Sequence, residues 1–367
     1  MSAITATTTA SEARPGRAPA PPVTIHPILD SVARHAWADY VTRAPAGTLF
    51  HHPDWCECVA AAFRHQPLHL LARRGGATVG VLPLLGVRSL LAGELLVSVP
   101  YGTYGGILAE DAEARAGLAA AAVRLTHARG ARLLELRSAV GGLAGWVDDR
   151  RYVVFTRRLP SRVEELETYL PRKARAAARQ ARRREGLTVR HDAGLLRLTW
   201  GLYARSMRRL GSLNYPYRFF EKLVETLGPR AWVTVVWKGA RPVAGLLSFV
   251  FRDRVYPYFV GVDERRRCTG ATNLLYLSVM ERAVGEGLRW FDFGRSRRDN
   301  VGAFDFKRNQ GFEPQPLGYQ RYVPPGATLP DLSPGNPRYA RLRRVWTRLP
   351  LALTRPLGAW LSASIPG

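Results

Sequence analysis

The chain has 367 residues, of which 54 are Lys or Arg and 29 are Asp or Glu, which gives a formal net charge of +25 at pH 7. Hydrophobic residues make up 46% of the chain, enough for packed cores, and this excludes a wholly disordered protein. The positive charge favours an anionic partner such as a phosphorylated ligand, nucleic acid or an anionic membrane, although a codon bias toward Arg would also produce part of it.

The first segment, residues 1–23, is predicted to be a disordered leader rich in Thr, Ala and Pro. It lacks the apolar stretch of a secretory signal, and no run of about 20 apolar residues follows that would span a membrane. The three cysteines, Cys56, Cys58 and Cys268, form no disulfide framework. These features predict a cytoplasmic protein, with peripheral contact at the inner face of the membrane as an open alternative.

A first domain is predicted at residues 24–168. Its stretch HHPDWCEC at 51–58 gathers His, Asp and Cys side chains, but the spacing matches no zinc motif and no second ligand pair follows. We therefore expect no metal there and a packing role for Trp55. The stretches at 75–85 and 127–138 each predict a glycine turn that leads into an apolar strand.

A basic helix is predicted in PRKARAAARQARRREG at 171–186, where residues 172–184 hold seven basic residues and no acid. Arg175, Arg179 and Arg182 recur at helical spacing, so one helix face is cationic. That face is either solvated or binds phosphate, and Arg175 and Arg179 are the candidate phosphate ligands.

A second domain is predicted at residues 169–325, with the basic helix at its start. Residues 230–262 predict three antiparallel strands, residues 270–287 a helix and WFDFG at 290–294 a further strand. This succession is that of the acyl-CoA N-acyltransferase (GNAT) core, an analogy of fold that does not fix function.

Matching segments in the two halves indicate an internal duplication. Gly130 and Gly287 each stand between a helix and a strand and are 157 residues apart, whereas Gly76 and Gly239 stand in matching turns and are 163 residues apart. Two similar offsets predict a repeated unit of roughly 160 residues. The predicted fold class is α+β, with two tandem GNAT-like domains, each a mixed, mostly antiparallel sheet flanked by helices.

An acyl-CoA enzyme would carry a pyrophosphate-binding loop before the central helix, where this chain has RRRCTGATN at 265–273. Arg267 and Gly270 fit that loop and are candidates for donor binding, but Thr272 replaces its last small residue. The backbone amides at this helix start could still bind an anion.

Lys307 is one of only four lysines in the chain and stands in GAFDFKRNQGFEP at 302–314. A buried ammonium can stabilise the oxyanion that develops when an amine attacks an ester or thioester. Asp292, in the strand-end sequence FDFGRS, could accept the proton of that amine or could pair with Arg295. A surface lysine without a function is the alternative for Lys307.

Several of these motifs together resemble the FemAB family, whose members move amino acids from aminoacyl-tRNA onto peptidoglycan precursors. YPYFVG at 256–261, the helix and strand at 270–296, and GAFDFKRNQGF at 302–312 resemble its second half. Motifs of the first half, at 50–63 and 80–106, and the basic helix resemble a FemAB-like subfamily associated with exosortase (PEP-CTERM) systems and exopolysaccharide export. The resemblance spans roughly residues 24–325. The chain lacks the long coiled-coil insertion that some members use around tRNA, which leaves tRNA dependence open.

The resemblance implies roles for particular residues. Phe306 and Lys307 match a Phe-Lys motif whose lysine lies near the donor ester and is implicated in catalysis. Tyr256 and Tyr258 match paired strand tyrosines that line the acceptor site, with core packing as their alternative. Arg209 falls near an arginine that contacts substrate phosphate. No bound cofactor is implied, and the donor substrate is aminoacyl-tRNA or acyl-CoA.

The last segment, residues 326–367, is predicted to be a basic amphipathic tail. Residues 336–367 hold six arginines, no acid, and the tryptophans Trp346 and Trp360. The tail either lies in the interface of an anionic leaflet or packs on the body of the protein through its tryptophans. Pro350 and Pro356 are expected to interrupt any long helix.

These observations predict an acyltransferase that joins an activated acyl group to an amine or hydroxyl of an anionic, phosphorylated or lipid-linked cell-envelope precursor. Lys307 and Asp292 are its candidate catalytic residues. The candidate substrate-binding residues are Tyr256, Tyr258, Phe306, Arg295, Arg209, Arg175 and Arg179. The alternatives are an acyl-CoA-dependent N-acyltransferase and a catalytically silent module that binds precursors or membrane within an export system. tRNA remains an alternative partner, and DNA is not expected.

Overall fold

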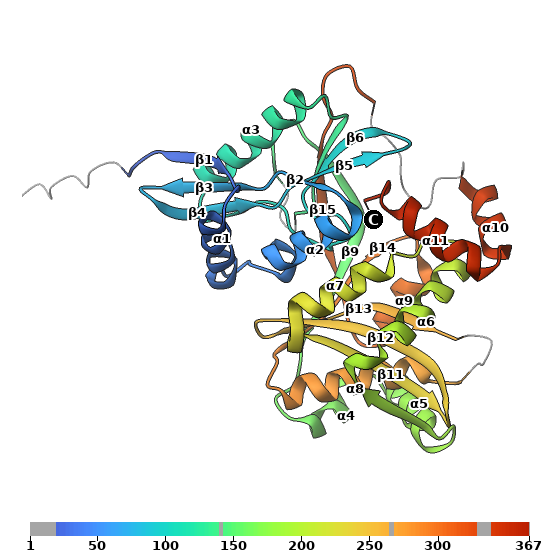
Figure 1. Cartoon of the computed structure of the whole chain (residues 1–367). Coiled ribbons are helices and arrows are strands. Elements are labelled where there is room, and N and C mark those ends of the chain that lie inside the picture. The colour runs from blue at the N-terminus through green and yellow to red at the C-terminus, as the bar shows by residue number, and fades with distance from the viewer. Residues whose placement is uncertain (1–19, 139–141, 264–267, 329–338, 367) are drawn as a thin grey trace, which may run out of the picture.

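The computed structural model describes residues 20–138, 142–263, 268–328 and 339–366 (Figure 1). Most of the predicted leader and Arg267 lie outside these residues. The helices of the first half are α1 (Ser31–Arg43), α2 (Pro53–Phe63) and α3 (Ala112–Ala128). Its strands are β1 (Val23–Pro27), β2 (Gln66–Pro67), β3 (Leu70–Arg74), β4 (Ala77–Leu82), β5 (Leu85–Ser89), β6 (Gly93–Val97), β7 (Leu108–Ala109), β8 (Leu133–Leu136) and β9 (Val147–Arg158).

The second half follows without a break. Its helices are α4 (Leu166–Tyr169), α5 (Arg172–Arg183), α6 (Leu196–Arg209), α7 (Tyr217–Leu227), α8 (Ala271–Gly285) and α9 (Val301–Asn309). Its strands are β10 (Leu187–His191), β11 (Ala231–Lys238), β12 (Arg241–Phe251), β13 (Arg254–Val262), β14 (Trp290–Arg297) and β15 (Pro314–Tyr322). The chain ends in α10 (Ala340–Arg348) and α11 (Leu351–Ser362).

The two halves repeat the same succession of elements, as the matching segments predicted. The β3–β4 hairpin turns at Gly76 and the β11–β12 hairpin at Gly239. Helix α3 ends before Gly130 and α8 before Gly287, and both glycines have left-handed φ angles, 61° and 75°, where the chain turns toward strands β8 and β14. The predicted α+β fold of two tandem GNAT-like units is confirmed.

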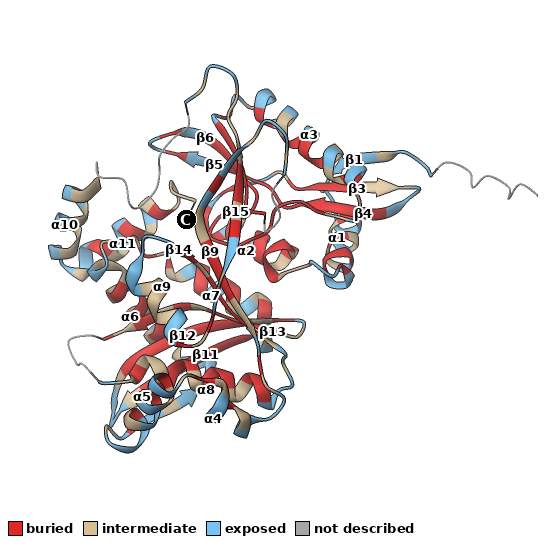
Figure 2. Cartoon of the chain, turned by 180° about the vertical axis from the view of Figure 1, so that it is seen from behind, coloured by how far each residue is buried: buried red, intermediate tan, exposed pale blue. Residues whose placement is uncertain are grey.

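One sheet runs through both halves in the order β10-β11-β12-β13-β14-β9-β15-β8-β6-β5-β2, and a second sheet, β1-β3-β4-β7, belongs to the first half. The halves exchange strands: β9 from the first half pairs with β14, and β15 from the second half pairs with β8. Figure 2 shows β9 and β15 running from one half to the other through the middle of the molecule. The exchange ties the predicted domains 24–168 and 169–325 together, and the boundary between them stays a prediction.

A hydrophobic cluster also joins the two halves. Trp55 of α2 is fully buried and packs edge-to-face against Phe219 of α7 and Phe249 of β12, with ring centroids 5.8 and 5.9 Å apart. Phe50, just before α2, packs in the same way against Tyr256 of β13 at 5.5 Å. Such pairs add to the free energy gained by burying aromatic surface. The first half is therefore held firmly against β12 and β13, beside the candidate active site.

The His-, Asp- and Cys-containing segment at 51–58 starts helix α2. The His52 ring accepts a hydrogen bond from the Asp54 amide, and the Asp54 carboxylate pairs with Arg230 of the second half at 2.7 Å. Cys56 and Cys58 are buried free thiols. Within the described residues, no three His, Cys, Asp or Glu side chains are grouped to hold a metal ion. The segment packs α2 against the second half.

The C-terminal tail packs on the body through α10 and α11. Trp346 Nε1 donates a hydrogen bond to the Ser212 carbonyl at 3.1 Å. Gly358 lies so close to Asn214 that a Cβ atom at this position would be 2.4 Å from the Asn214 amide oxygen. Trp346 and one face of α11 therefore pack on the body of the protein, which is one of the two alternatives predicted for the tail.

The two tail prolines behave differently. Pro350 separates α10 from α11, as predicted, but Pro356 lies inside α11, so the expectation that it ends a helix is wrong. A proline removes one helical hydrogen bond, and packing of α11 on the body on both sides of Pro356 holds the helix together. No helix among the described residues has the length and hydrophobicity needed to cross a membrane.

Candidate active site

The candidate active site lies where strands β13 and β14 separate. The two strands are paired in parallel only at Arg254–Trp290 and Val255–Phe291, although β13 continues to Val262. Strand β14 then bulges away from β9 between Asp292 and Arg295, where Gly294 has a left-handed φ of 67°. The bulge turns backbone groups of β14 away from the sheet, and these groups bind Lys307.

A loop of the first half, VPYGTYGG at 99–106 (the glycine loop), packs against the place where the strands separate. Tyr258 Oη donates a hydrogen bond to the Tyr101 carbonyl at 2.6 Å, and Tyr319 Oη donates to the Thr103 carbonyl at 2.5 Å. Tyr101 is buried and has a φ of 62°, an uncommon conformation for a residue with a side chain. All residues of the glycine loop are buried, so the loop packs tightly against the strands that carry the candidate site.

Lys307 projects from α9 toward the bulge in β14. Its ammonium donates hydrogen bonds to the carbonyl oxygens of Gly294 and Arg295 at 3.2 and 2.9 Å, and it lies 5.3 Å from the centre of the Phe155 ring. An ammonium has three N–H donors, so one remains for a ligand. The side chain is half-buried and held by two hydrogen bonds, and its catalytic role stays a prediction.

Asp292 is the buried acid of the same bulge. Its Oδ1 accepts a hydrogen bond from the Gly294 amide at 2.8 Å, and its Oδ2 lies 3.2 Å from Arg254 Nη1. The alternative of a pair with Arg295 is not realised, because the guanidinium of Arg295 donates instead to Tyr319 Oη at 2.8 Å and lies over the Tyr152 ring at 4.6 Å.

Burial shifts the pKa values of Lys307 and Asp292 in opposite directions. Desolvation lowers the pKa of Lys307 from 10.5 to about 7, with Arg295 acting in the same direction and Asp292 against it. Desolvation raises the pKa of Asp292 from 3.8 to about 7, against the Gly294 hydrogen bond and the charge of Lys307. The nearby Arg254 guanidinium also favours the ionised carboxylate. An acid and a base whose pKa values lie near neutrality are typical of sites that transfer protons.

The predicted tyrosines and Phe306 lie near this site in different ways. Tyr256 is 2% exposed and packs in the shared core, whereas Tyr258 is half-buried and reaches the glycine loop through its hydroxyl. Both rings pack on Phe50, as expected of alternate residues on one strand face. Phe306 packs on Tyr276 of α8 at 5.5 Å, which fixes α9 and so positions Lys307.

The predicted phosphate-binding arginines lie apart from Lys307. Arg179 forms an ion pair with Glu167 at 3.1 Å, and Arg175 donates a hydrogen bond to the Glu167 carbonyl. The lack of a compensating acid in the basic segment was therefore misleading, because the acid comes from α4. Arg209 lies exposed at the C-terminal end of α6. Phosphate binding by these three arginines stays a prediction.

Gly270 stands at the start of α8 with a φ of 76°. A Cβ atom there would be 2.1 Å from the Ala177 carbonyl oxygen of α5, so Gly270 is needed for close packing of two helices. The role of Gly270 in donor binding stays a prediction, as does that of Arg267, which lies outside the described residues.

Three groups at the site were not predicted from the sequence. Arg254 contacts Asp292, Tyr319 links Arg295 to the glycine loop, and Thr103 accepts from Tyr319. The run of glycines around Thr103 was the one available signal, since glycines often mark close backbone approach. No local pattern distinguishes Arg254 or Tyr319, because their partners come from distant segments.

Comparison with known proteins supports this reading of the fold. Residues 171–308, which run from the start of α5 to just beyond Lys307, match the acetyltransferase (GNAT) domain family. No curated protein matches the chain in sequence.

Several solved structures have a similar fold. The chain is similar to FemX (16% identity, TM-score 0.60, 81% of this chain and 97% of that one). It is also similar to a tandem GNAT protein from the clavulanic acid biosynthesis pathway (15% identity, TM-score 0.51, 84% and 100%). A third is the C-terminal domain of a putative lysylphosphatidylglycerol synthetase from Agrobacterium fabrum (12% identity, TM-score 0.51, 78% and 91%). The chain therefore has a tandem GNAT fold, and residues 171–308 of its second half match the acetyltransferase (GNAT) domain family.

Proposed function

We propose that the protein transfers an activated acyl group, an aminoacyl ester in the first place, to an amine or hydroxyl of a phosphorylated or lipid-linked cell-envelope precursor. The observation that carries this proposal is the position of Lys307 at the bulge of β14, with two of its donors bound to carbonyl oxygens and one left for a ligand.

The chemistry follows from the charges at the bulge. The acceptor nitrogen attacks the donor carbonyl carbon, which forms the new C–N bond and places negative charge on the carbonyl oxygen. The remaining N–H of the Lys307 ammonium stabilises that oxygen. Asp292 takes the proton of the attacking amine through water; the donor C–O bond then breaks, and the leaving oxygen receives the proton. A hydroxyl acceptor follows the same steps and gives an ester.

The donor is proposed to be an aminoacyl ester rather than acyl-CoA. In acyl-CoA enzymes of this fold the pyrophosphate binds at the start of the central helix, which here is α8. The Ala177 carbonyl lies against Gly270 at that helix start, and a carbonyl oxygen repels phosphate oxygens. We propose aminoacyl-tRNA as the carrier of this ester. Its phosphate backbone is strongly negative and would be attracted by the positive net charge of the chain.

The acceptor is proposed to be an anionic precursor of the cell envelope. The names FemX and lysylphosphatidylglycerol synthetase, carried by two proteins of similar fold, support this class of acceptor. We also propose that the chain belongs to the exosortase-associated subfamily. We further propose that residues 336–367 contact the inner face of the membrane.

A transfer assay tests the proposal. Full-length protein and its Lys307→Ala variant would be mixed with a membrane-lipid extract and with either labelled aminoacyl-tRNA or labelled acyl-CoA, and the label in the lipid fraction counted. We expect label from aminoacyl-tRNA with the unchanged protein only. Label from acyl-CoA alone would replace the proposed donor, and label from neither would contradict transferase activity.

The rate of transfer is expected to depend on pH with a maximum near 7. Asp292 must be ionised, so the rate rises as pH rises through its pKa of about 7; Lys307 must be protonated, so the rate falls as pH rises through its own pKa of about 7. Because Asp292 and Lys307 interact, the two apparent pKa values of the rate profile belong to the pair and not to either residue alone. Measurement of kcat/KM from about pH 5 to about pH 9 checks the shape. A flat profile across this range would exclude both groups as titrating catalysts.

A further inference from the structure

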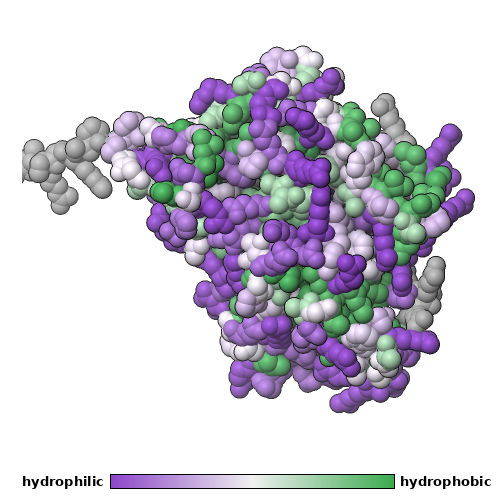
Figure 3. Space-filling model, in the orientation of Figure 1, coloured by the Kyte–Doolittle hydropathy of each residue, from purple (hydrophilic) through white to green (hydrophobic). Residues whose placement is uncertain are grey.

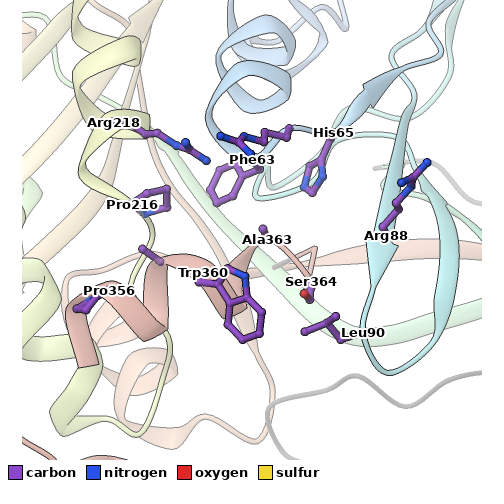
Figure 4. A pocket seen from close by; sticks show the side chains of 12 residues that line it. Phe63, His65, Arg88, Leu90, Pro216, Arg218, Pro356, Trp360, Ala363 and Ser364 are labelled. Atoms are coloured by element: carbon purple, nitrogen blue, oxygen red, sulfur yellow. The ribbon is translucent and has the colours of Figure 1, made fainter. Parts of the chain in front are cut away.

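A pocket of about 640 Å³ lies on the far side of the glycine loop, between the two halves and the C-terminal tail (Figure 4). Its walls come from the end of α2, the end of β5, the start of α7 and helix α11. Figure 4 shows Trp360 and Leu90 on one side, with Phe63 and His65 facing them. We call it the arginine pocket because Arg64, Arg88 and Arg218 line it.

The charges of the arginine pocket are uncompensated. Of the described residues that line it, none is acidic. Within the described part of the chain, none of the Arg64, Arg88 and Arg218 guanidinium groups has a hydrogen-bond or ion-pair partner. Many other arginines here do pair, as Arg179 and Arg182 do with glutamates. Three unpaired guanidinium groups around one pocket attract an anion and match the geometry of phosphate.

Arg64 stands in an unusual backbone conformation that places it at the pocket. It is the residue after α2 and has left-handed φ and ψ angles of 58° and 37°. Glycine is the usual residue at such a helix end, because a side chain there costs about 1 kcal/mol or more. Arginine in this position directs a third charge toward the pocket at the expense of local stability.

The rest of the pocket lining is mostly apolar. Leu90 is 64% exposed and Trp360 63%, whereas Phe63 and Pro216 are buried in the wall. Figure 3 shows hydrophobic side chains over α11 and over the tip of the β5–β6 hairpin, among hydrophilic ones. The exposed apolar residues of these two elements are Leu90, Leu91, Leu353, Leu357 and Trp360. Large exposed apolar surface beside cationic groups fits a ligand with a phosphate head and a hydrocarbon chain.

Tyr101 connects the arginine pocket to the candidate active site. The Tyr101 ring stacks on Phe63 with ring centroids 3.9 Å apart, and its hydroxyl lies 2.9 Å from His65 Nε2. The backbone carbonyl of Tyr101 accepts the hydrogen bond from Tyr258, and its amide donates to Pro366 of the tail. Contacts therefore run from the pocket walls at Phe63 and His65 through Tyr101 to Tyr258, beside the candidate active site.

We infer that the arginine pocket binds a phosphate-bearing lipid, with the phosphate between Arg64, Arg88 and Arg218 and the hydrocarbon chain along Trp360 and Leu90. Its assignment as the anchor of the acceptor rests on the proposed function, whereas binding itself does not. The tail thus forms one wall of a ligand site in addition to packing on the body.

Calorimetric titration of the full chain with farnesyl phosphate, with farnesol and with inorganic phosphate tests the site. We expect farnesyl phosphate to bind at least about tenfold more tightly than either other probe, because only it supplies both head and chain. If inorganic phosphate binds as tightly as farnesyl phosphate, the pocket is a site for a free anion, and the lipid assignment is overturned. Equal binding of farnesol would show that the arginines do not take part.

Matched variants separate the pocket from general charge. The triple variant Arg64→Gln, Arg88→Gln, Arg218→Gln is expected to weaken binding of farnesyl phosphate by about tenfold or more, and Trp360→Ala by several-fold. A control triple, Arg124→Gln, Arg132→Gln, Arg241→Gln, removes the same charge from exposed positions outside the pocket and is expected to bind normally. Equal weakening by both triples would overturn the proposed site.

Transfer kinetics then separate the anchor from the reaction. The pocket triple is expected to raise KM for the lipid acceptor with little change in kcat, while Lys307→Ala lowers kcat and keeps lipid binding. Lost binding with an unchanged acceptor KM would overturn the anchor role and leave the transferase proposal standing. If the unchanged protein transfers nothing, the proposed function fails, and the titrations still decide whether the pocket binds the lipid.

Discussion

Replacement of Lys307 by Ala is expected to lower kcat by about 10²-fold or more while the fold is retained. The ammonium is held by two backbone carbonyls at the bulge of β14, so its charge is fixed before the substrate arrives. Removal of one preorganised donor to a developing oxyanion costs about 10²- to 10³-fold in rate. The measurement is single-turnover transfer, with circular dichroism and thermal unfolding to confirm the fold.

Two further variants make the Lys307 result specific. Lys238→Ala removes an exposed lysine that pairs with Glu185 at 2.7 Å, and it should leave kcat unchanged. Lys307→Arg keeps a positive charge that does not titrate near neutrality, so any remaining activity should lose the fall in rate above pH 7. A folded Lys307→Ala variant with normal turnover would remove Lys307 from the mechanism.

The sequence predicted the repeated fold because local signals mark each unit. Gly130 and Gly287 had to be glycines at the ends of their helices, since both adopt left-handed φ angles, and this shared constraint made the duplication visible. The strands of the second half could also be predicted, because apolar stretches are separated by clear turn residues from 231 to 262. Both signals depend only on neighbours in the chain.

Features that depend on distant partners could not be predicted. The exchange of β9 and β15 between the halves is a choice of pairing partner, and nothing within either strand specifies it. The face of Arg175 and Arg179 looked uncompensated because Glu167 lies on a separate helix. At the site, Lys307 could be singled out as a rare residue type, whereas the contact of Arg254 with Asp292 depends on strands that adjoin only in the folded chain.

Replacement of Gly270 by Ala is expected to destabilise the protein by about 3 kcal/mol or more. The left-handed conformation costs a residue with a side chain about 1 to 2 kcal/mol. The added Cβ would also lie 2.1 Å from the Ala177 carbonyl oxygen and 3.2 Å from the Ala181 side chain, so α5 must move away from α8. Such overpacking costs a further 1 to 3 kcal/mol or so. The lowered midpoint of thermal unfolding, measured by calorimetry, checks this expectation.

Gly287→Ala is the matched control, because it changes a glycine of nearly the same φ, 75°, at the other end of the same helix, where a Cβ atom would meet nothing within 4 Å. It should cost only the conformational strain, about 1 to 2 kcal/mol. The difference between the two variants therefore measures the close approach of α5. If both variants unfold at the same temperature, the approach of α5 to Gly270 is not tight, and the Ala177 carbonyl no longer argues against a coenzyme pyrophosphate at this helix start. That result would favour acyl-CoA over an aminoacyl ester as the donor.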